Sequence, residues 1–229
     1  RMYPRGKLAG HFIGFTNVDG KGVEGAEAAF DAVLRSGGQP LRLTIDAGAQ
    51  FVLEEELDKA YADFDMKGGA GVVLDAHTGA VRAIASWPAI DPNRPGDRSE
   101  IAKPNRAINS LFELGSIFKP LTVAAAMEED VLRVGDTFNV SQPLRIGGWT
   151  VRDPHPLPNP QAVTPSDILA FSSNIGAVQI AQRLGSGNQK KFLESVGLLE
   201  RPDYDGPQAA APLTASQWDA LTSATVSYG

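Results

Sequence analysis

A serine and a lysine stand three residues apart in the segment Glu113–Pro120, which reads ELGSIFKP. Positions i and i+3 share one face of a helix, so the Ser116 hydroxyl and the Lys119 amine are expected to lie one turn apart. Serine is a weak nucleophile until a neighbouring base takes its proton. A lysine held out of water can be that base, because burial disfavours its charged form. The S-x-x-K spacing is therefore typical of acyl transfer through a covalent serine ester.

The residues around this pair favour the start of a helix. Gly115 permits a tight backbone turn, and Pro120 is tolerated only in a first helical turn, so Ser116 is predicted near a helix N-terminus. Unpaired N–H groups at such an end favour an anionic serine oxygen and a developing oxyanion. The apolar residues 121–127 can bury the helix. Taken alone, the spacing also fits a serine near a helix start followed by a solvated lysine.

A second polar pattern, S-x-N, occupies residues 172–174 between two apolar helical patterns. Thr164 and Pro165 predict the cap and the first position of a short helix, and a 3.6-residue apolar period restarts at Ile175. A polar loop between two apolar helices can present a hydroxyl and an amide to a cleft, although Ser and Asn also cap helices without any chemical role. The two motifs in this order are more specific than either one alone.

Apolar periodicity and turn residues predict the elements that position these motifs. Helices are expected over residues 26–34 and 53–64, each with one buried side. Short apolar runs around Gly-containing turns predict β-hairpins over residues 71–85 and 144–151. The segment Thr214–Gln217 fits a capping box that opens a late helix.

Several further segments occur in a fixed order along nearly the whole chain. They are RMYPRG (1–6), HFIGFTNVDGKGVEG (11–25), LTID (43–46), DAHTG (75–79), DPN (91–93), NRA (105–107) and SYG (227–229). With these segments and the two motifs, the chain resembles the class B penicillin-binding proteins, the peptidoglycan transpeptidases of bacteria, and within them the division-specific (septal) members.

The resemblance implies an α+β fold, the penicillin-binding transpeptidase fold, in which helices flank an antiparallel sheet and a helical subdomain carries S-x-x-K and S-x-N. It assigns residues 1–40 to the end of an N-terminal non-catalytic (pedestal) module and residues 41–229 to the N-terminal part of the transpeptidase domain. The family's third motif, K-[ST]-G on a strand beside the nucleophile, does not occur in these 229 residues. We therefore expect a fragment, or one piece of a divided protein, that lacks the C-terminal strands, is inactive alone and needs the remaining C-terminal part of the same protein.

The resemblance also implies a function, peptidoglycan D,D-transpeptidation during septal cell-wall synthesis, with acylation by β-lactam antibiotics. Ser116 would attack the penultimate D-alanine of a D-Ala-D-Ala stem peptide, and its backbone N–H would be one oxyanion donor. Lys119 would accept the serine proton and Ser172 would relay it to the leaving amine. Asn174 would bind the substrate backbone and help to hold Lys119. No cofactor and no metal are implied.

Partners and location follow from the same resemblance. Besides the stem peptide and β-lactams, we expect a septal glycosyltransferase and other division proteins as partners. The family usually has an N-terminal anchor, which places the protein in the inner membrane with its catalytic domain in the periplasm. No apolar stretch of this sequence approaches the ~20 residues that cross a bilayer.

Two alternatives remain open. In a serine β-lactamase or D,D-carboxypeptidase, water would resolve the acyl-enzyme. Class A β-lactamases use a general-base Glu for this purpose, but Glu200, which follows S-x-N, lacks the expected sequence context. A non-catalytic protein of the same fold could instead sense β-lactams or act as a division scaffold.

The remaining features exclude other classes of function. A net charge of −6 and a pI of about 5.1 argue against a nucleic-acid partner, and the absence of cysteine excludes disulfides and thiolate chemistry. Residues 20–25 satisfy G-x-G-x-x-G, but a turn separates them from the preceding apolar run, so dinucleotide binding is disfavoured. Asp153 and His155 are predicted to lie in a Pro-rich surface loop rather than to bind a metal.

Overall fold

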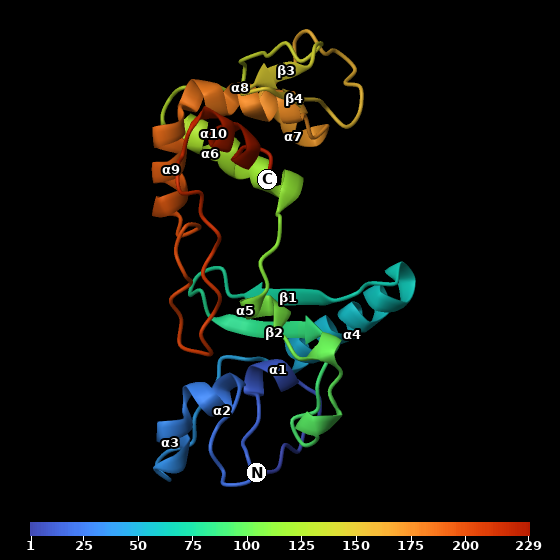
Figure 1. The fold of residues 1–229 in the computed structure, drawn as a ribbon, viewed down its shortest axis with the longest axis vertical. Helices are drawn as coiled ribbons and strands as arrows, with labels where there is room; N and C mark the ends of the chain where they lie inside the picture. The colour runs from blue at the N-terminus through green and yellow to red at the C-terminus, as the bar shows by residue number, and fades with distance from the viewer. The chain divides into compact units, whose positions relative to one another are not determined.

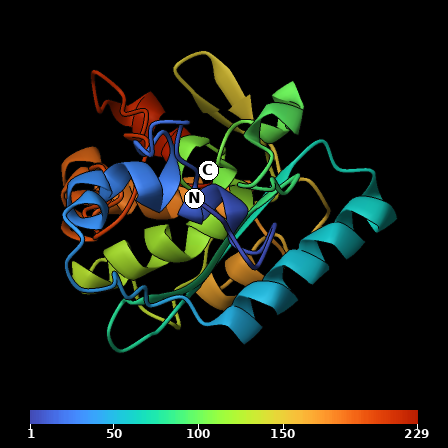
Figure 2. The same cartoon turned by 90° about the horizontal axis from the view of Figure 1, so that it is seen from below.

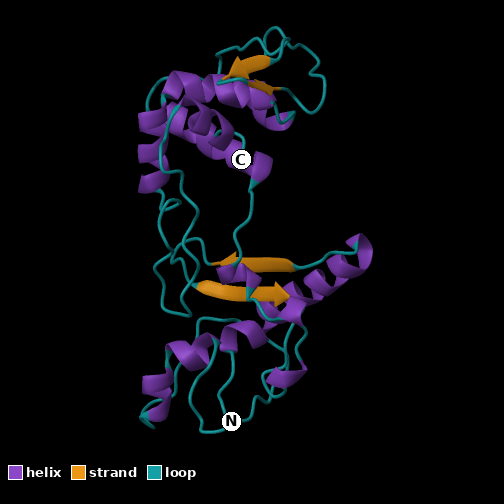
Figure 3. Cartoon of the chain, in the orientation of Figure 1, coloured by secondary structure: helices purple, strands orange, loops and turns teal.

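The computed structural model describes all residues from 1 to 229, and the chain forms two compact units (Figure 1). The first unit consists of Arg1–Ser110 and Pro202–Ala210, and the second of Leu111–Arg201 and Ala211–Gly229. Each unit contains one small antiparallel sheet, drawn in orange in Figure 3. The division of the chain into a module of residues 1–40 and a domain of residues 41–229 stays a prediction.

The first unit is built around the predicted β-hairpin. Its elements are α1 (Gly10–Ile13), α2 (Gly25–Ala29), α3 (Asp31–Arg35), α4 (Ala47–Phe64), β1 (Gly69–Leu74), β2 (Val81–Trp87), η1 (Pro95–Asp97), η2 (Glu100–Ala102) and α5 (Arg106–Asn109). Strands β1 and β2 pair antiparallel, with Gly69 opposite Trp87. At the turn, Asp75 accepts hydrogen bonds from the backbone N–H groups of Thr78 and His77, which lower the pKa of its carboxyl to about 2. The hairpin prediction is confirmed.

Helix α4 packs against this hairpin, mainly on β2 (Figure 2). The contact depends on Gln50, a polar side chain with no exposed surface. Its amide nitrogen donates to the carbonyl oxygen of Ile84 at 2.9 Å, and its amide oxygen accepts from the Ile84 N–H at 2.8 Å. Gln50 thus pairs with β2 as a neighbouring strand would, and the helix covers a row of backbone groups that would otherwise be buried without partners.

The helix predicted over residues 26–34 is divided in two. Helix α2 ends at Ala29, and Phe30 leaves the helical region with φ −112° and ψ 20° before α3 begins at Asp31. The Asp31 carboxylate accepts a hydrogen bond from the Gly22 N–H at 2.8 Å. This tertiary contact turns α3 toward residues 15–23, a constraint that apolar periodicity does not encode.

The G-x-G-x-x-G segment is not a strand-to-helix turn. Residues 15–23 fold back on themselves, with an antiparallel bridge between Thr16 and Gly22 and a hydrogen bond from the Val23 N–H to the Phe15 carbonyl. Several N–H groups of the segment are already paired within the unit, including those of Lys21 and Gly22. The segment therefore does not present the open row of donors that a pyrophosphate needs.

The second unit is mainly helical. Its elements are η3 (Gly115–Phe118), α6 (Lys119–Glu128), β3 (Leu144–Ile146), β4 (Trp149–Val151), α7 (Pro165–Ala170), α8 (Asn174–Leu184), α9 (Ser186–Ser195) and α10 (Ala220–Val226). Helix α8 is its centre and packs against α6, α7, α9 and α10. The α8 side chains Ile175, Val178 and Ile180 are almost completely buried among apolar residues of these neighbours. The predicted hairpin over residues 144–151 is confirmed as β3 and β4.

The two predicted helix starts in this unit have different outcomes. The predicted cap at Thr164 is confirmed, and the structure adds a capping box between Thr164 and Asp167. The capping box predicted at Thr214–Gln217 is wrong, because α10 begins at Ala220 and Asp219 caps it by accepting from the Thr222 N–H. The start of α10 is fixed by tertiary contacts that join it to α9.

Those contacts centre on Gln189 of α9, which is 1% exposed. Its amide oxygen accepts from the Trp218 indole N–H, and its amide nitrogen donates to the Ser223 carbonyl. They hold the first turn of α10 where the local sequence alone would not place it. None of the helices in the chain has the length and apolar character that crossing a membrane requires.

Substitution of Gln50 tests the packing of α4 on the hairpin. Gln50→Leu removes the partners of the Ile84 N–H and C=O while keeping the site filled. We expect it to lower the free energy of unfolding by about 2–4 kcal/mol, because buried backbone groups left unpaired carry a desolvation penalty. Urea unfolding followed by circular dichroism measures the change.

Glu55→Leu is the control, since Glu55 lies on the same helix and is exposed. It is expected to change stability by less than about 0.5 kcal/mol. Equal stability of Gln50→Leu and the unsubstituted protein would show that the amide does not hold the helix.

Candidate active site

The segment that carries S-x-x-K is a tight helical turn that leads into α6. Residues Gly115–Phe118 form the 3₁₀ helix η3, and α6 begins at Lys119 with Pro120 in its first turn. A 3₁₀ helix has about three residues per turn, so side chains at i and i+3 eclipse one another. This geometry places the Lys119 Nζ atom 3.0 Å from the Ser116 Oγ atom. The predicted neighbourhood of the two groups is confirmed, in a tighter helix than the sequence indicates.

Four oxygen atoms surround the Lys119 amine. They are Ser116 Oγ at 3.0 Å, the Ser172 carbonyl oxygen at 2.7 Å, Ser172 Oγ at 2.8 Å and Asn174 Oδ1 at 2.7 Å. An ammonium group has three protons and no acceptor, whereas a neutral amine has two protons and a lone pair. The neutral form can donate to two of these oxygens and accept the proton of a hydroxyl. All four candidate residues, Ser116, Lys119, Ser172 and Asn174, therefore meet at one point.

Burial sets the protonation of the lysine. Lys119 is only 1% exposed, whereas Ser116 is exposed and open to an incoming molecule. Loss of water around the amine lowers the pKa of Lys119 below its ordinary value, and the negative charge of Asp153 opposes this shift in part. The site thus combines an accessible hydroxyl with a dry amine that is more easily neutral than an ordinary lysine.

The S-x-N turn delivers two of the four oxygens. Ser172 has a positive φ of 58°, and this backbone conformation lets both its carbonyl and its hydroxyl contact Lys119. The Ser172 hydroxyl also donates to Ser116 Oγ at 2.8 Å. Ser173 is completely buried and caps α8 by accepting from the Gly176 N–H. Of the two serines in the segment FSSN, only Ser173 therefore has the capping role that such residues often have.

The orientation of the Asn174 amide is fixed from its other end. Its nitrogen donates to the carbonyl oxygen of Arg152 at 3.1 Å, so its oxygen turns toward Lys119. One amide proton remains after this bond, since an amide nitrogen carries two. That proton is available to a bound molecule.

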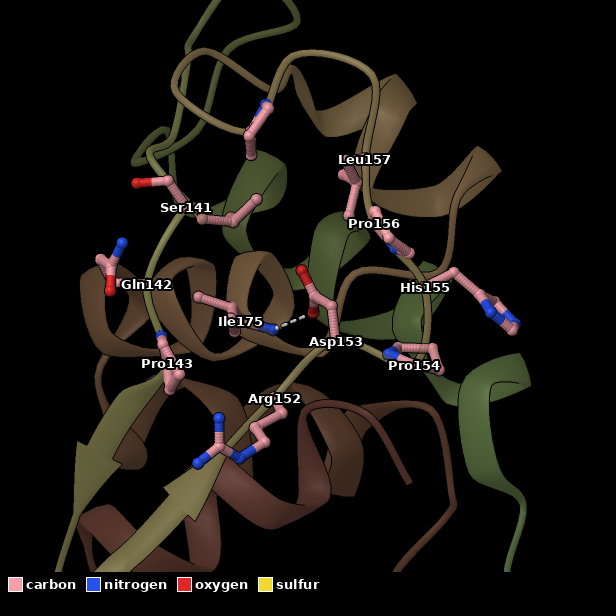
Figure 4. Close-up of a pocket in the computed structure, with 12 residues that line it drawn as sticks. Ser141, Gln142, Pro143, Arg152, Asp153, Pro154, His155, Pro156, Leu157 and Ile175 are labelled. Carbon is pink, nitrogen blue, oxygen red and sulfur yellow. Dashed lines mark hydrogen bonds between the residues drawn. The ribbon is translucent and has the colours of Figure 1, made fainter.

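Sequence reasoning missed the part that Asp153 has in this site. We predicted a surface-loop position for Asp153 and His155, which is correct only for His155, an exposed side chain. The Asp153 carboxylate instead accepts from the Ile175 N–H (Figure 4) and also from the Ser173 hydroxyl. Nothing in the spacing connects Asp153 to a motif that follows about 20 residues later.

No three His, Cys, Asp or Glu side chains in the chain lie close enough together to hold a metal ion. Beside the S-x-N turn, Arg152, Asp153, Ile175 and the Pro-rich loop line an open hollow of about 360 Å³ (Figure 4). The arrangement can activate a hydroxyl with an amine.

The C-terminal segment SYG lies against the nucleophile turn. The Ser227 carbonyl accepts from the Thr122 hydroxyl of α6 at 2.8 Å. Gly229 approaches Gly115 so closely that a Cβ atom on it would lie 2.2 Å from the Gly115 carbonyl oxygen. The segment thus contacts both α6 and the residue before Ser116, which gives a structural role to a segment noted only for its resemblance.

Substitution of Gly176 tests how tightly the S-x-N turn must be packed. A Cβ atom at Gly176 would lie 2.5 Å from Ile168 Cγ1 and 3.1 Å from Ser173 Oγ. Because Ile168 is fully buried, we expect Gly176→Ala to destabilise the protein by about 1–3 kcal/mol and to lower its melting temperature. Differential scanning calorimetry measures the change.

Gly187→Ala is the matched control, because Gly187 lies in α9 with open space around its Cα atom. There, alanine should raise stability by up to about 1 kcal/mol through helix propensity. If both substitutions raised the melting temperature, α7 and the S-x-N turn would be more loosely packed than the structure indicates.

Comparisons with known proteins identify the family of the chain. The sequence pattern of the penicillin binding protein transpeptidase domain matches residues 69–229. Over its whole length, the chain has 37% sequence identity to a probable peptidoglycan D,D-transpeptidase FtsI from Caulobacter vibrioides. The match covers 39% of that protein. The chain also has 33% sequence identity to a probable peptidoglycan D,D-transpeptidase PenA from Neisseria gonorrhoeae, in a match that covers 44% of that protein. The chain thus spans about two fifths of the length of these relatives.

A solved structure shows the same fold. The crystal structure of penicillin binding protein 3 from Mycobacterium tuberculosis superposes with a TM-score of 0.86 at 30% identity, over 100% of this chain and 54% of that one. The same protein has been solved in complex with aztreonam and with ampicillin. Together with the matched domain and the Ser116–Lys119 geometry, this shows that the chain has the predicted α+β transpeptidase fold and belongs to the penicillin-binding protein transpeptidase family.

Proposed function

We propose that this chain supplies the nucleophile side of a peptidoglycan D,D-transpeptidase site, which cross-links stem peptides through a serine acyl-enzyme. The observation that carries the proposal is the contact of a buried amine with an exposed hydroxyl, at 3.0 Å between Lys119 Nζ and Ser116 Oγ. A base for serine needs hydrogen-bond reach and a pKa near the working pH, and burial moves Lys119 in that direction. The names of the relatives, peptidoglycan D,D-transpeptidases, supply the reaction class.

The reaction begins when a D-Ala-D-Ala stem peptide places its penultimate carbonyl at Ser116. The neutral Lys119 amine takes the hydroxyl proton as the oxygen forms a bond to the carbonyl carbon, and the Ser116 backbone N–H stabilises the resulting oxyanion. Collapse of this intermediate breaks the peptide bond, and the terminal D-alanine leaves with a proton. The product is an ester between the stem peptide and Ser116.

Ser172 is placed to pass that proton. Its hydroxyl lies 2.8 Å from both the Lys119 amine and Ser116 Oγ, so one hydroxyl bridges the base and the reacting oxygen. Asn174 holds the amine with its amide oxygen and keeps one amide proton for the backbone of the substrate. An amine from a neighbouring stem peptide then attacks the ester, forms the cross-link and restores the Ser116 hydroxyl.

β-Lactams would enter the same reaction, because their ring presents a reactive amide carbonyl to the serine. The related penicillin binding protein 3 has been solved with two such compounds. We assign the activity to the full-length protein, in which a K-[ST]-G strand would bind the substrate's terminal carboxylate. By the same likeness we propose a role in septal wall synthesis on the periplasmic side of the inner membrane, together with a septal glycosyltransferase and other division proteins.

The structure offers less support for hydrolysis as the main reaction. Glu200, the carboxylate that follows S-x-N, is exposed and makes no hydrogen bond to Ser116, Lys119 or Ser172. A β-lactamase needs a base that activates water against the ester. Persistence of the penicilloyl ester would support a transpeptidase, and rapid release of hydrolysed penicillin would support a β-lactamase or carboxypeptidase.

Substitution of Ser116 tests the identity of the nucleophile. In the full-length protein, Ser116→Ala should abolish covalent labelling by a fluorescent penicillin, because no ester can form. Gel fluorescence after denaturation measures the label, and Ser195→Ala, at an exposed position on α9, should label as the unsubstituted protein does. Labelling of Ser116→Ala at the usual rate would assign the chemistry to another residue.

The dependence of acylation on pH tests Lys119 as the base. Since only the neutral amine can accept the proton, the acylation rate should rise with pH and level off once Lys119 is neutral. Because burial lowers the pKa of Lys119, the midpoint of this rise should fall below 10.5, the ordinary value for lysine. Lys119→Arg, which stays charged, should lose about 10²–10⁴-fold in rate.

Lys190→Arg on the exposed side of α9 is the control and should leave the profile unchanged. Stopped-flow acylation with a fluorescent penicillin gives the rates. A pH profile of Lys119→Arg that matches that of the unsubstituted protein would rule out the amine as the base.

A further inference from the structure

The connection that follows β4 reaches the S-x-N turn with two groups. The Arg152 carbonyl accepts from the Asn174 amide, and the Asp153 carboxylate binds the two residues on either side of Asn174. One carboxylate oxygen accepts from the Ser173 hydroxyl at 2.9 Å, and the other accepts from the Ile175 N–H at 2.9 Å. Figure 4 shows the carboxylate turned toward the start of α8. Each carboxylate oxygen therefore binds a different residue of the S-x-N turn and the start of α8.

These bonds form a chain that fixes the first turn of α8. Ser173 has no exposed surface, and its hydroxyl oxygen accepts from the Gly176 N–H while its proton goes to Asp153. Charge-assisted hydrogen bonds of this kind are stronger than neutral ones. Asp153 thus stabilises the cap of α8 from outside the helix.

The turn that these bonds hold is a strained one. Ser172 has a φ of 58°, a conformation that residues with a Cβ atom rarely adopt and that costs about 1–3 kcal/mol. In this conformation both Ser172 oxygens contact Lys119, at 2.7 and 2.8 Å. The bonds of Asp153 to Ser173 and Ile175 lie directly after the strained residue, where they can hold it in place.

Asp153 also acts on Lys119 through its charge. The groups that contact the amine from η3, from the α7–α8 turn and from α8 are all uncharged, namely Ser116, Ser172 and Asn174. Asp153 binds the residues on either side of Asn174, whose amide oxygen contacts the amine, and its negative charge favours the ammonium form. Proton transfer from Ser116 converts a neutral amine into an ammonium ion, so a nearby negative charge stabilises the product of that step.

We propose that Asp153 is a positioning residue for acyl transfer, which holds Ser172 and Asn174 against Lys119 and whose negative charge favours proton transfer to the amine. The inference rests on the proposed function. In the step concerned, the Ser116 O–H bond breaks, an N–H bond forms on Lys119, and the oxygen electron pair forms the bond to the acyl carbon. Asp153 touches neither the substrate nor the reacting atoms and takes no proton.

Three substitutions in the full-length protein separate position from charge. Asp153→Asn removes the charge but keeps an acceptor for the Ile175 N–H and an amide that can bond to Ser173 Oγ. Asp153→Ala removes both the charge and the contacts. Ser173→Ala removes one contact and leaves the charge. Acylation rates with a fluorescent penicillin are measured against pH, and thermal unfolding shows which variants are folded.

We expect the rise of the rate with pH to move to lower pH in Asp153→Asn, because the charge that favours the ammonium form is lost. Ser173→Ala should lower the plateau rate about 10–100-fold through misplacement of the turn, without moving the rise. Asp153→Ala should show both effects. Asp136→Asn makes the same charge change at a carboxylate whose partners are Arg133 and Arg183, and it should leave the profile unchanged.

Two results would overturn the inference. An unchanged pH profile in Asp153→Asn would show that the charge of Asp153 does not act on Lys119. A folded Ser173→Ala variant with the usual plateau rate would show that the contact of Asp153 with Ser173 does not position the site. Both are distinct from failure of the proposed function, in which the unsubstituted protein itself would form no penicilloyl ester. If Asp153→Ala does not fold, Asp153→Asn still tests the role of the charge and Ser173→Ala still tests the role in positioning.

Discussion

The burial of one amine among four oxygen atoms is the constraint on which the rest of this site depends. A charged ammonium group deprived of water loses solvation that hydrogen bonds replace only in part, so burial shifts Lys119 toward its neutral form. The oxygens of Ser172 and Asn174 lie at hydrogen-bonding distance and hold the amine in place. The fold therefore keeps a potential base dry while Ser116, its target, stays exposed.

The positions of η3, α6 and α8 together determine this arrangement. The 3₁₀ turn brings Ser116 over Lys119, and α6 continues from it into the apolar core. Helix α8 starts at Asn174, and its close packing on Ile168 leaves no room for a side chain at Gly176. The two motifs lie on different helices whose apolar sides meet, so the position of the hydroxyl and that of the amide are set by one core. Polar function here depends on apolar packing.

The sequence predicted those parts of the site that local geometry determines. The i, i+3 spacing of Ser116 and Lys119 predicts that they lie close together on one helical turn, and Thr164 before Pro165 predicts the cap of α7. Contacts between distant segments have no such signature. The carboxylate of Asp153 reaches the S-x-N turn through a tertiary contact, and the start of α10 depends on Gln189 of another helix. Periodicity could predict that these helices exist but not where each one begins.

Direct observation of the ionisation of Lys119 tests the account most closely. In the full-length protein, carbon-13 at the ε position of lysine reports the charge of each amine by NMR as the pH changes. We expect Lys119 to lose its proton at a pH below 10.5, the ordinary pKa of lysine, because desolvation disfavours the ammonium form. Loss of the Lys119 proton at or above that pH would contradict the proposed role of the amine.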